Sequence, residues 1–145
     1  MTIPIYTKSN FREGWIEYDR PFPDGFSEQA GPLIFREPGA EAGVGFLATK
    51  SHENYIGLVH GGSLMSLVDV TMWDICRRAV GEESLKAATI TLNVEFMSPA
   101  SVGDFIQGSG ELLKGGRSIL FARGQIRNDE KTLLSFSGTM KRVAR

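Results

Sequence analysis

The sequence predicts an α+β fold in which one curled antiparallel β-sheet of about six strands wraps around one long central helix. Three observations predict it. Residues 63–80 are apolar around most of the circumference of a helix, two short apolar runs precede this stretch, and alternating segments typical of four strands follow it. The absence of a second long helical pattern excludes doubly wound α/β folds, whose parallel strands are joined by helical crossovers.

The predicted central helix carries apolar side chains on nearly all of its sides, which is typical of a helix that other elements surround. Arg77 and Arg78 near its end suit the negative pole of the helix dipole, and Gly81 suits a C-terminal cap. We expect Trp73 in the core or at a seam between subunits. Cys76 is expected to be a core residue rather than a nucleophile, because its neighbours at helical spacing are apolar.

Two strands are expected before the helix and four after it. The apolar runs 31–37 and 42–50 are joined by Pro38-Gly39 and predict a hairpin. In the strand expected over 88–96, alternation predicts that one face carries Ala88, Ile90, Leu92, Val94 and Phe96. The other three strands are expected at about 104–113, 118–127 and 132–142, and a Lys-Gly-Gly-Arg turn joins the first two of them.

The chain divides into an arm and one domain. Residues 1–25 contain scattered aromatics and prolines and are expected to form an irregular N-terminal arm. Residues 26–145 are expected to form a single domain, with a short helical turn near 24–30. The 145 residues are enough for one hydrophobic core without metals or disulfides.

Composition narrows the function classes. The formal net charge is -1, so nothing global favours binding to nucleic acid or to an anionic membrane. A single cysteine cannot form an internal disulfide, and no apolar run approaches the ~20 residues of a membrane helix. We expect a cytoplasmic protein with no nucleic-acid or membrane partner. The sequence carries no metal-ligand spacing and no nucleotide fingerprint, so no metal or separate cofactor is expected, and His52 is expected on a surface loop.

Asp69 is the first candidate for chemistry, because it falls in the middle of the apolar helix between Val68 and Val70. A buried carboxylate costs several kcal/mol unless it is paired or solvated. It can therefore be part of a salt bridge with an arginine, or lie at a solvated seam between subunits. Alternatively, it is a carboxylate at a cleft, where reduced solvation makes it a better base or nucleophile.

The sequence His60-Gly61-Gly62 at the predicted helix start is the second candidate. Glycine weakens helix initiation by roughly 1 kcal/mol relative to alanine, so the two glycines need an offsetting benefit. Their backbone N–H groups are accessible to a ligand and lie at the positive end of the helix dipole. Such groups can stabilise the oxyanion that forms when a thioester carbonyl is attacked. A loop-to-helix turn that requires glycine torsions is the structural alternative.

The spacing of these two candidates predicts an oligomer. Gly61 and Asp69 are eight residues apart, which corresponds to ~12 Å along one helix. An attacking water and the carbonyl it attacks must be about 3 Å apart. If both groups act on one carbonyl, two antiparallel helices related by a two-fold axis must supply them, one from each subunit.

A family resemblance extends this hypothesis. The sequence Asn54-Tyr-Ile-Gly-Leu-Val-His60-Gly-Gly62, followed by Leu67-Val68-Asp69, resembles the signature of hotdog-fold acyl-CoA thioesterases. The similarity is to the PaaI-like (phenylacetate-degradation) and thioesterase superfamily member 2-like group. It continues through Ala88-Thr-Ile-Thr-Leu-Asn-Val-Glu-Phe-Met-Ser-Pro-Ala100, Gly103-Asp104 and the turn 114–117, and covers roughly residues 30–142.

The resemblance implies roles for five candidate catalytic residues. Gly61 would donate its N–H to the thioester oxygen, and Asp69 of the facing subunit would act as general base or nucleophile. Asn54 would hold the carbonyl or order the water, unless it only stabilises its loop. Thr89 replaces a serine of the relatives that positions the water, although alternation places Thr89 off the core face and an ordinary strand role is the alternative. His60 would shape the loop rather than act as an acid.

The resemblance also implies where coenzyme A binds. The implied residues, together with Gly62, are Phe96, Met97, Ser98 and Pro99 in one segment and Lys114, Gly116, Arg117 and Ser118 in another. Lys114 and Arg117 suit phosphate groups, although a solvated hairpin tip explains them equally well. Lys141, Arg142 and Arg145 form a second cationic cluster that could serve the same purpose.

The function expected from these residues is hydrolysis of an acyl- or aryl-acyl-CoA to the free acid and CoA, in an active site shared between two subunits. A dimer is then obligatory, and the family resemblance favours a homotetramer. A non-catalytic binder of acyl-CoA or aromatic ligands is the first alternative, favoured if ligand binds without thiol release. A hotdog hydratase or dehydratase is the second, and activity on enoyl-CoA would identify it.

Overall fold

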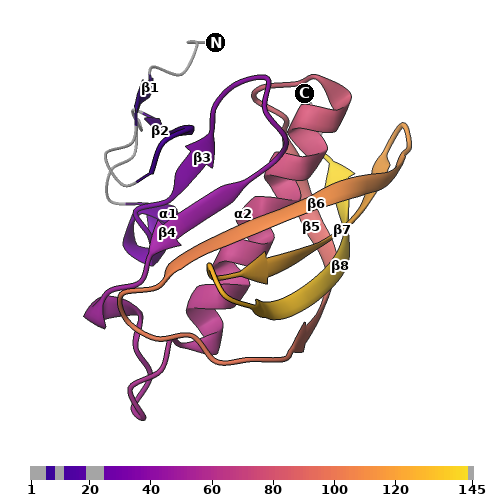
Figure 1. Ribbon diagram of the computed structural model, residues 1–145. Helices are drawn as coiled ribbons and strands as arrows, with labels where there is room; N and C mark the ends of the chain where they lie inside the picture. The colour runs from indigo at the N-terminus through magenta and orange to yellow at the C-terminus, as the bar shows by residue number, and fades with distance from the viewer. Residues whose placement is uncertain (1–5, 9–11, 19–24, 144–145) are drawn as a thin grey trace.

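The computed structural model describes residues 6–8, 12–18 and 25–143, which form one antiparallel sheet and one long helix (Figure 1). Helix α2 (Gly61–Val80) packs against the inner face of the sheet. The strand order is β1-β2-β3-β4-β6-β7-β8-β5. The strands are β1 (Tyr6–Lys8), β2 (Trp15–Tyr18), β3 (Ile34–Arg36), β4 (Val44–Leu47), β5 (Ala87–Phe96), β6 (Phe105–Gly115), β7 (Ile119–Arg127) and β8 (Thr132–Arg142). Two short helices are α1 (Phe26–Ala30) and the 3-10 helix η1 (Lys50–His52).

The predicted fold class is confirmed, and the sheet has eight strands rather than about six. The two additional strands, β1 and β2, come from the segment expected to be an irregular arm, so that description was wrong for these residues. β2 pairs with β3, and Trp15 and Ile16 are buried there. These two strands therefore extend the sheet at one edge, where the side chains of Trp15 and Ile16 are buried.

Glycines let α2 approach the sheet closely. A Cβ atom added to Gly138 of β8 would lie 2.6 Å from the Met72 sulfur, and one added to Gly108 of β6 would collide with the Thr71 side chain. Met72 and Thr71 are fully buried at these contacts. The helix is thus surrounded by the curled sheet, as its apolar circumference predicts.

A β-bulge changes which side chains of β5 face the helix. The pairing of β5 with β8 shifts between Thr89, opposite Met140, and Thr91, opposite Thr139. A bulge inserts one residue, so the alternation of faces reverses beyond it. The expectation that Ile90 shares the inner face with Leu92 was therefore wrong, as it was for Ala88, and Ile90 is 52% exposed. Thr89 takes the inner position instead.

Helix α2 begins at Gly61, within the His-Gly-Gly sequence predicted as its start, and His60 caps it. The His60 Nδ1 atom accepts a hydrogen bond from the Gly62 N–H at 2.7 Å. At the other end, Gly81 adopts a left-handed conformation, φ 71°, and the predicted C-terminal cap is confirmed. Cys76 is buried, as expected, and burial raises the pKa of its thiol to about 11.

His52 is buried rather than on a surface loop. Its Nδ1 atom accepts a hydrogen bond from the Thr49 N–H at 2.9 Å, and its Nε2 atom lies 3.0 Å from the Gly31 carbonyl oxygen. The ring also packs on Phe46, with 4.6 Å between ring centroids. The histidine therefore connects the loop before α2 to the end of α1. The expectation of a surface position was wrong because the polar residues next to His52 in the sequence do not indicate its contact with the distant Gly31.

Asp74 is a buried charged residue that the sequence analysis missed. Its carboxylate is fully buried and accepts hydrogen bonds from the Arg77 and Arg78 guanidinium groups at 2.7 to 3.1 Å. It also accepts the Gly43 N–H at 2.9 Å. Arg78 donates in addition to backbone carbonyls of the β3–β4 hairpin. Asp74 thus fixes the C-terminal half of α2 to that hairpin.

We expect Asp74→Asn to lower the free energy of unfolding by about 3 kcal/mol, because it leaves buried guanidinium groups without their shared carboxylate. Urea unfolding followed by circular dichroism measures the change. Glu111→Gln is the matched control, since its ion pair with Arg123 is solvent-exposed on both sides and should contribute less than about 1 kcal/mol. Equal destabilisation by both substitutions would contradict the structural role of Asp74.

Candidate active site

Asp69 and Thr89 form a pair at the surface of the single chain. Thr89 Oγ1 donates a hydrogen bond to Asp69 Oδ1 at 2.5 Å. Asp69 directly follows the buried Leu67 and Val68 and is itself exposed, so the expectation of a buried carboxylate does not hold within one chain. The buried, arginine-paired carboxylate of α2 is Asp74. The bulge in β5 explains the Asp69 contact, because it turns Thr89 toward the helix.

Gly61 offers a free backbone donor at the start of α2. It is the first residue of the helix, and none of the residues that the structure describes accepts its N–H. The Gly62 N–H, by contrast, is bonded to His60, so it cannot serve a ligand as expected without loss of this cap. A Cβ on Gly62 would lie 2.9 Å from the His60 ring, which explains glycine at this position.

Asn54 organises the loop that leads to α2. Its side-chain oxygen accepts hydrogen bonds from the N–H groups of Ile56 at 3.0 Å and Leu58 at 3.1 Å. This is the loop-stabilising arrangement considered above. The Asn54 side-chain N–H groups have no partner among the described residues, and they remain available for a ligand.

The candidate residues of one chain fall into two half-sites. Asp69 and Thr89 make the carboxylate half-site. Gly61 and Phe96 make the amide half-site, because a Cβ on Gly61 would lie 3.8 Å from the Phe96 ring. Thr89 and Phe96 lie near opposite ends of β5, opposite Met140 and Leu134 of β8 respectively. These positions are ~20 Å apart along the strand.

The two predicted coenzyme-binding segments also lie at opposite ends of the sheet. The β6–β7 hairpin tip, 114–118, is at the carboxylate end, because Leu120 pairs with Met140, which pairs with Thr89. Lys114, Arg117 and Lys141 are exposed there, and Arg142 is bonded to Glu82. The residues Phe96, Met97, Ser98 and Pro99 follow the other end of β5, beside Gly61. One chain therefore does not bring these segments together. Arg145 lies outside the described residues.

An apolar groove adjoins the carboxylate half-site. It has a volume of about 560 Å³ and lies between α1, α2, β3 and β5. Its lining includes Asp69 and Thr89 together with the apolar side chains of Leu33, Phe35, Val70, Trp73 and Met140. The Trp73 indole N–H donates to the Leu85 carbonyl at 2.8 Å, which holds the ring in place. The groove can therefore receive an apolar group next to the carboxylate.

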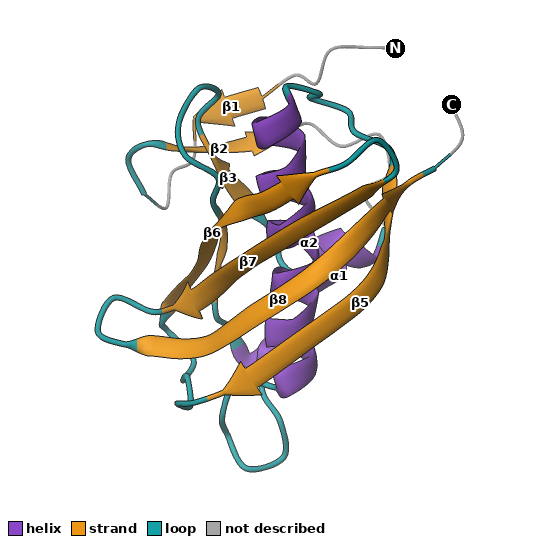
Figure 2. Ribbon diagram, turned by 90° about the vertical axis from the view of Figure 1, so that its right-hand side faces the viewer, coloured by secondary structure: helices purple, strands orange, loops and turns teal. Residues whose placement is uncertain are grey.

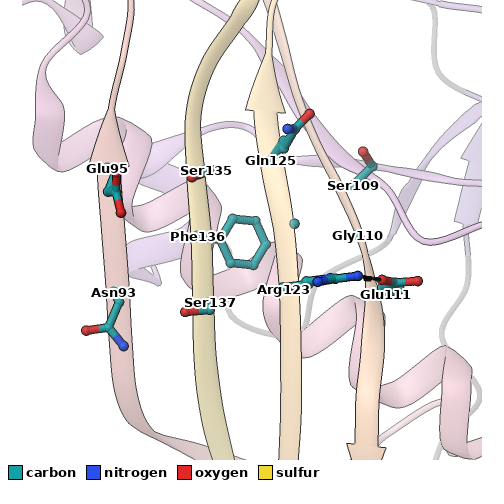
Figure 3. Close-up of a pocket in the computed structure, with 11 residues that line it drawn as sticks. Asn93, Glu95, Ser109, Gly110, Glu111, Arg123, Gln125, Ser135, Phe136 and Ser137 are labelled. Carbon is teal, nitrogen blue, oxygen red and sulfur yellow. Dashed lines mark hydrogen bonds and ion pairs between the residues drawn. The ribbon is translucent and has the colours of Figure 1, made fainter.

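A second hollow of about 570 Å³ lies on the outer face of the sheet (Figure 3). Its lining consists mainly of polar side chains from β5 to β8, and it includes the Arg123–Glu111 ion pair, 2.7 Å. None of the residues predicted for the site lines it. The predicted site residues thus lie outside this hollow.

A helix-borne carboxylate paired with a hydroxyl at an apolar groove, on this topology, defines a hotdog-fold protein with a candidate hydrolytic site. Residues 56–135 match the Thioesterase superfamily, and the chain belongs to this family. It is 32% identical over 81 residues to acyl-coenzyme A thioesterase 13 of Mus musculus. The aligned region covers 54% of this chain and 55% of the relative. The chain thus spans about half the length of this curated relative.

Solved structures agree on the fold. A variant of the phenylacetic acid degradation protein PaaI from Thermus thermophilus superposes with a TM-score of 0.71 at 21% identity, covering 83% of this chain and 100% of that one. A thioesterase protein with coenzyme A from Streptococcus pneumoniae gives 0.62 at 22% identity, covering 72% and 79%. In the described part of the chain, no helix is long and apolar enough to cross a membrane.

Proposed function

We propose that the protein hydrolyses the thioester bond of acyl-CoA, in active sites that two subunits share. The observation that carries the proposal is the Asp69–Thr89 pair at the mouth of an apolar groove. Membership of the Thioesterase superfamily supports the reaction class. The names of the matched relatives, which include an acyl-coenzyme A thioesterase and a thioesterase with coenzyme A, support CoA as the thiol half of the substrate.

In the proposed reaction, Asp69 removes a proton from water, and the water oxygen attacks the thioester carbonyl carbon. The Gly61 N–H of the other subunit stabilises the oxyanion, aided by the dipole of its helix. The C–S bond then breaks, and the CoA thiolate takes up the proton. Direct attack by Asp69 would form an anhydride instead. Incorporation of ¹⁸O into Asp69 during turnover in ¹⁸O-water would identify the anhydride route, because water that attacks the Asp69 carbonyl of the anhydride leaves its oxygen there.

The free edge of β5 supports the shared site. β5 is ten residues long and the last strand of the sheet (Figure 2), and proteins seldom leave such an edge unpaired. Pairing with a second copy about Asn93 would place Thr89 opposite Phe96 of the partner subunit, because the bulge leaves Ile90 without an opposite residue. The carboxylate half-site would then meet the partner's amide half-site. This is the same two-fold relation that the helix spacing demands.

The coenzyme segments support the same arrangement. Within one chain the 96–99 segment and the 114–118 turn are at opposite ends of the sheet. The two-fold axis through the centre of β5 would bring the turn of one subunit beside the 96–99 segment of the other. One CoA could then contact both segments, with its phosphates near Lys114 and Arg117.

Complementation between inactive variants tests the shared site. Asp69→Asn disables the carboxylate half-site, and Gly61→Pro removes the N–H of the amide half-site. When the two variants are co-expressed, each mixed dimer contains one doubly damaged site and one intact site. We expect thiol release to recover to about a quarter of the wild-type rate after random assortment. No recovery in demonstrably mixed dimers would mean that each site lies within one chain.

Substrate screening separates hydrolysis from the alternatives. We expect acyl-CoAs to release free thiol with the wild-type protein. Calorimetric binding without thiol release would instead identify a non-catalytic binder, and loss of enoyl-CoA absorbance would identify a hydratase. The expected homotetramer is a further part of the proposal, and sedimentation at four times the chain mass of 15.9 kDa would support it.

A further inference from the structure

The loop before α2 presents two apolar side chains to solvent. Tyr55 is 99% exposed and Ile56 is 62% exposed in the single chain. The loop that carries them is nevertheless well held, by the two hydrogen bonds to the Asn54 side chain and by a bridge between Glu53 and Val59. Neighbouring large apolar side chains that an ordered loop exposes to solvent are typical of a contact surface.

The apolar groove beside Asp69 is the surface that lacks a cover. It is open to solvent in one chain, and Phe26 at its rim is 74% exposed. The walls that one chain supplies are α1, β3, the start of β5 and the face of α2 that carries Val70 and Trp73. An acyl group held there would therefore have one side in water unless a further element closed the groove.

The proposed two-fold axis brings the loop to the groove. It passes midway between Gly61 and Asp69, at the level of Met65. Gly61, the first residue of α2, is then level with Asp69 of the partner subunit, and the loop before Gly61 would continue toward the level of the partner's Trp73. Figure 1 shows that the loop protrudes past the N-terminal end of α2. In the proposed dimer the loop would therefore extend along the partner helix in that direction.

We propose that Tyr55 and Ile56 of one subunit close the acyl groove of the other and thereby select the acyl group. This inference rests on the proposed function. The fixed Trp73 ring forms the wall within the chain, and Tyr55 of the partner subunit forms the facing wall. The groove that one chain supplies has a volume of about 560 Å³, in the range of sites for small organic ligands, so it leaves room for an acyl group longer than acetyl.

Acyl-chain selectivity is the first test. We measure kcat/KM for acetyl-CoA and octanoyl-CoA with the wild type, Tyr55→Ala, Ile56→Ala and, as a matched control, Leu47→Ala, an exposed aliphatic residue of β4. The ratio of octanoyl to acetyl activity should fall about tenfold in Tyr55→Ala and less in Ile56→Ala, because only the longer chain contacts this wall. Leu47→Ala should keep the wild-type ratio. An unchanged ratio, or an equal loss for both substrates, would overturn the proposal.

Cross-linking between subunits is the second test. Chains with Ile56→Cys are co-expressed with chains carrying Ser27→Cys, which lines the groove, and treated with a short bismaleimide. Cys76 is buried and should not react. A covalent dimer should form in this mixture, but not when Leu47→Cys replaces Ile56→Cys. Absence of the dimer in an active enzyme would overturn the inference alone, whereas a wild type that hydrolyses no acyl-CoA would overturn the proposed function.

Discussion

Asp69→Asn should lower kcat for acyl-CoA hydrolysis by about 10³-fold, within the range that a positioned general base contributes. The amide keeps the size of the carboxylate and can still accept the Thr89 hydroxyl hydrogen bond, but it cannot take a proton from water. Thiol release under saturating substrate measures kcat. Because Asp69 is exposed in the chain, the substitution should leave the urea unfolding midpoint near that of the wild type.

The control for this substitution is Glu111→Gln. Glu111 is an exposed carboxylate of β6 on the outer face of the sheet, so its neutralisation should change kcat less than twofold. Thr89→Val tests the hydroxyl separately, because valine matches threonine in shape and removes only the donor to Asp69. It should lower kcat by about tenfold, and Thr89→Ser should restore it. Near wild-type turnover in Asp69→Asn would eliminate the proposed mechanism.

The sequence predicts the helix and the meander because both depend on periodicity. The all-round apolar pattern of 63–80 and the alternation after residue 87 have only one economical burial, which the structure adopts. The bulge at Thr89 could not be predicted in this way, because apolar and polar residues alternate through residues 88–92 without interruption. The inner position of Thr89 therefore became visible only in the pairing of β5 with β8.

Charged residues of the helix were harder to assign than apolar ones. Asp69 and Asp74 both interrupt the apolar pattern of α2, and periodicity does not distinguish them. The difference arises from neighbours distant in sequence: Asp74 meets the Gly43 N–H of the β3–β4 hairpin, whereas Asp69 meets Thr89. The buried contacts of His52 with Gly31 are of the same kind. Contacts between segments that are distant in sequence determine whether such polar side chains are buried, and a single sequence does not show these contacts.

The amide half-site can be tested by a substitution at its single donor. Gly61→Pro should lower kcat by about 10²-fold to 10³-fold, which is the loss typical when one oxyanion donor is removed. Proline lacks the N–H but suits the first position of a helix, where no intrahelical hydrogen bond is lost. His60 precedes it with φ -63° and ψ 136°, a conformation that a residue before proline favours. The helix should therefore persist.

Gly61→Ala provides the matched comparison, because it adds a side chain and keeps the N–H. The nearest atoms to the new Cβ would be those of the Phe96 ring at 3.8 Å, an ordinary contact, so alanine should fit in the single chain. Circular dichroism confirms the fold of both variants, and thiol release measures kcat. A large loss of kcat in Gly61→Pro with little loss in Gly61→Ala would assign the effect to the missing N–H donor. Equal losses in the two variants would instead point to crowding of the site by the added carbon and would remove the oxyanion role from Gly61.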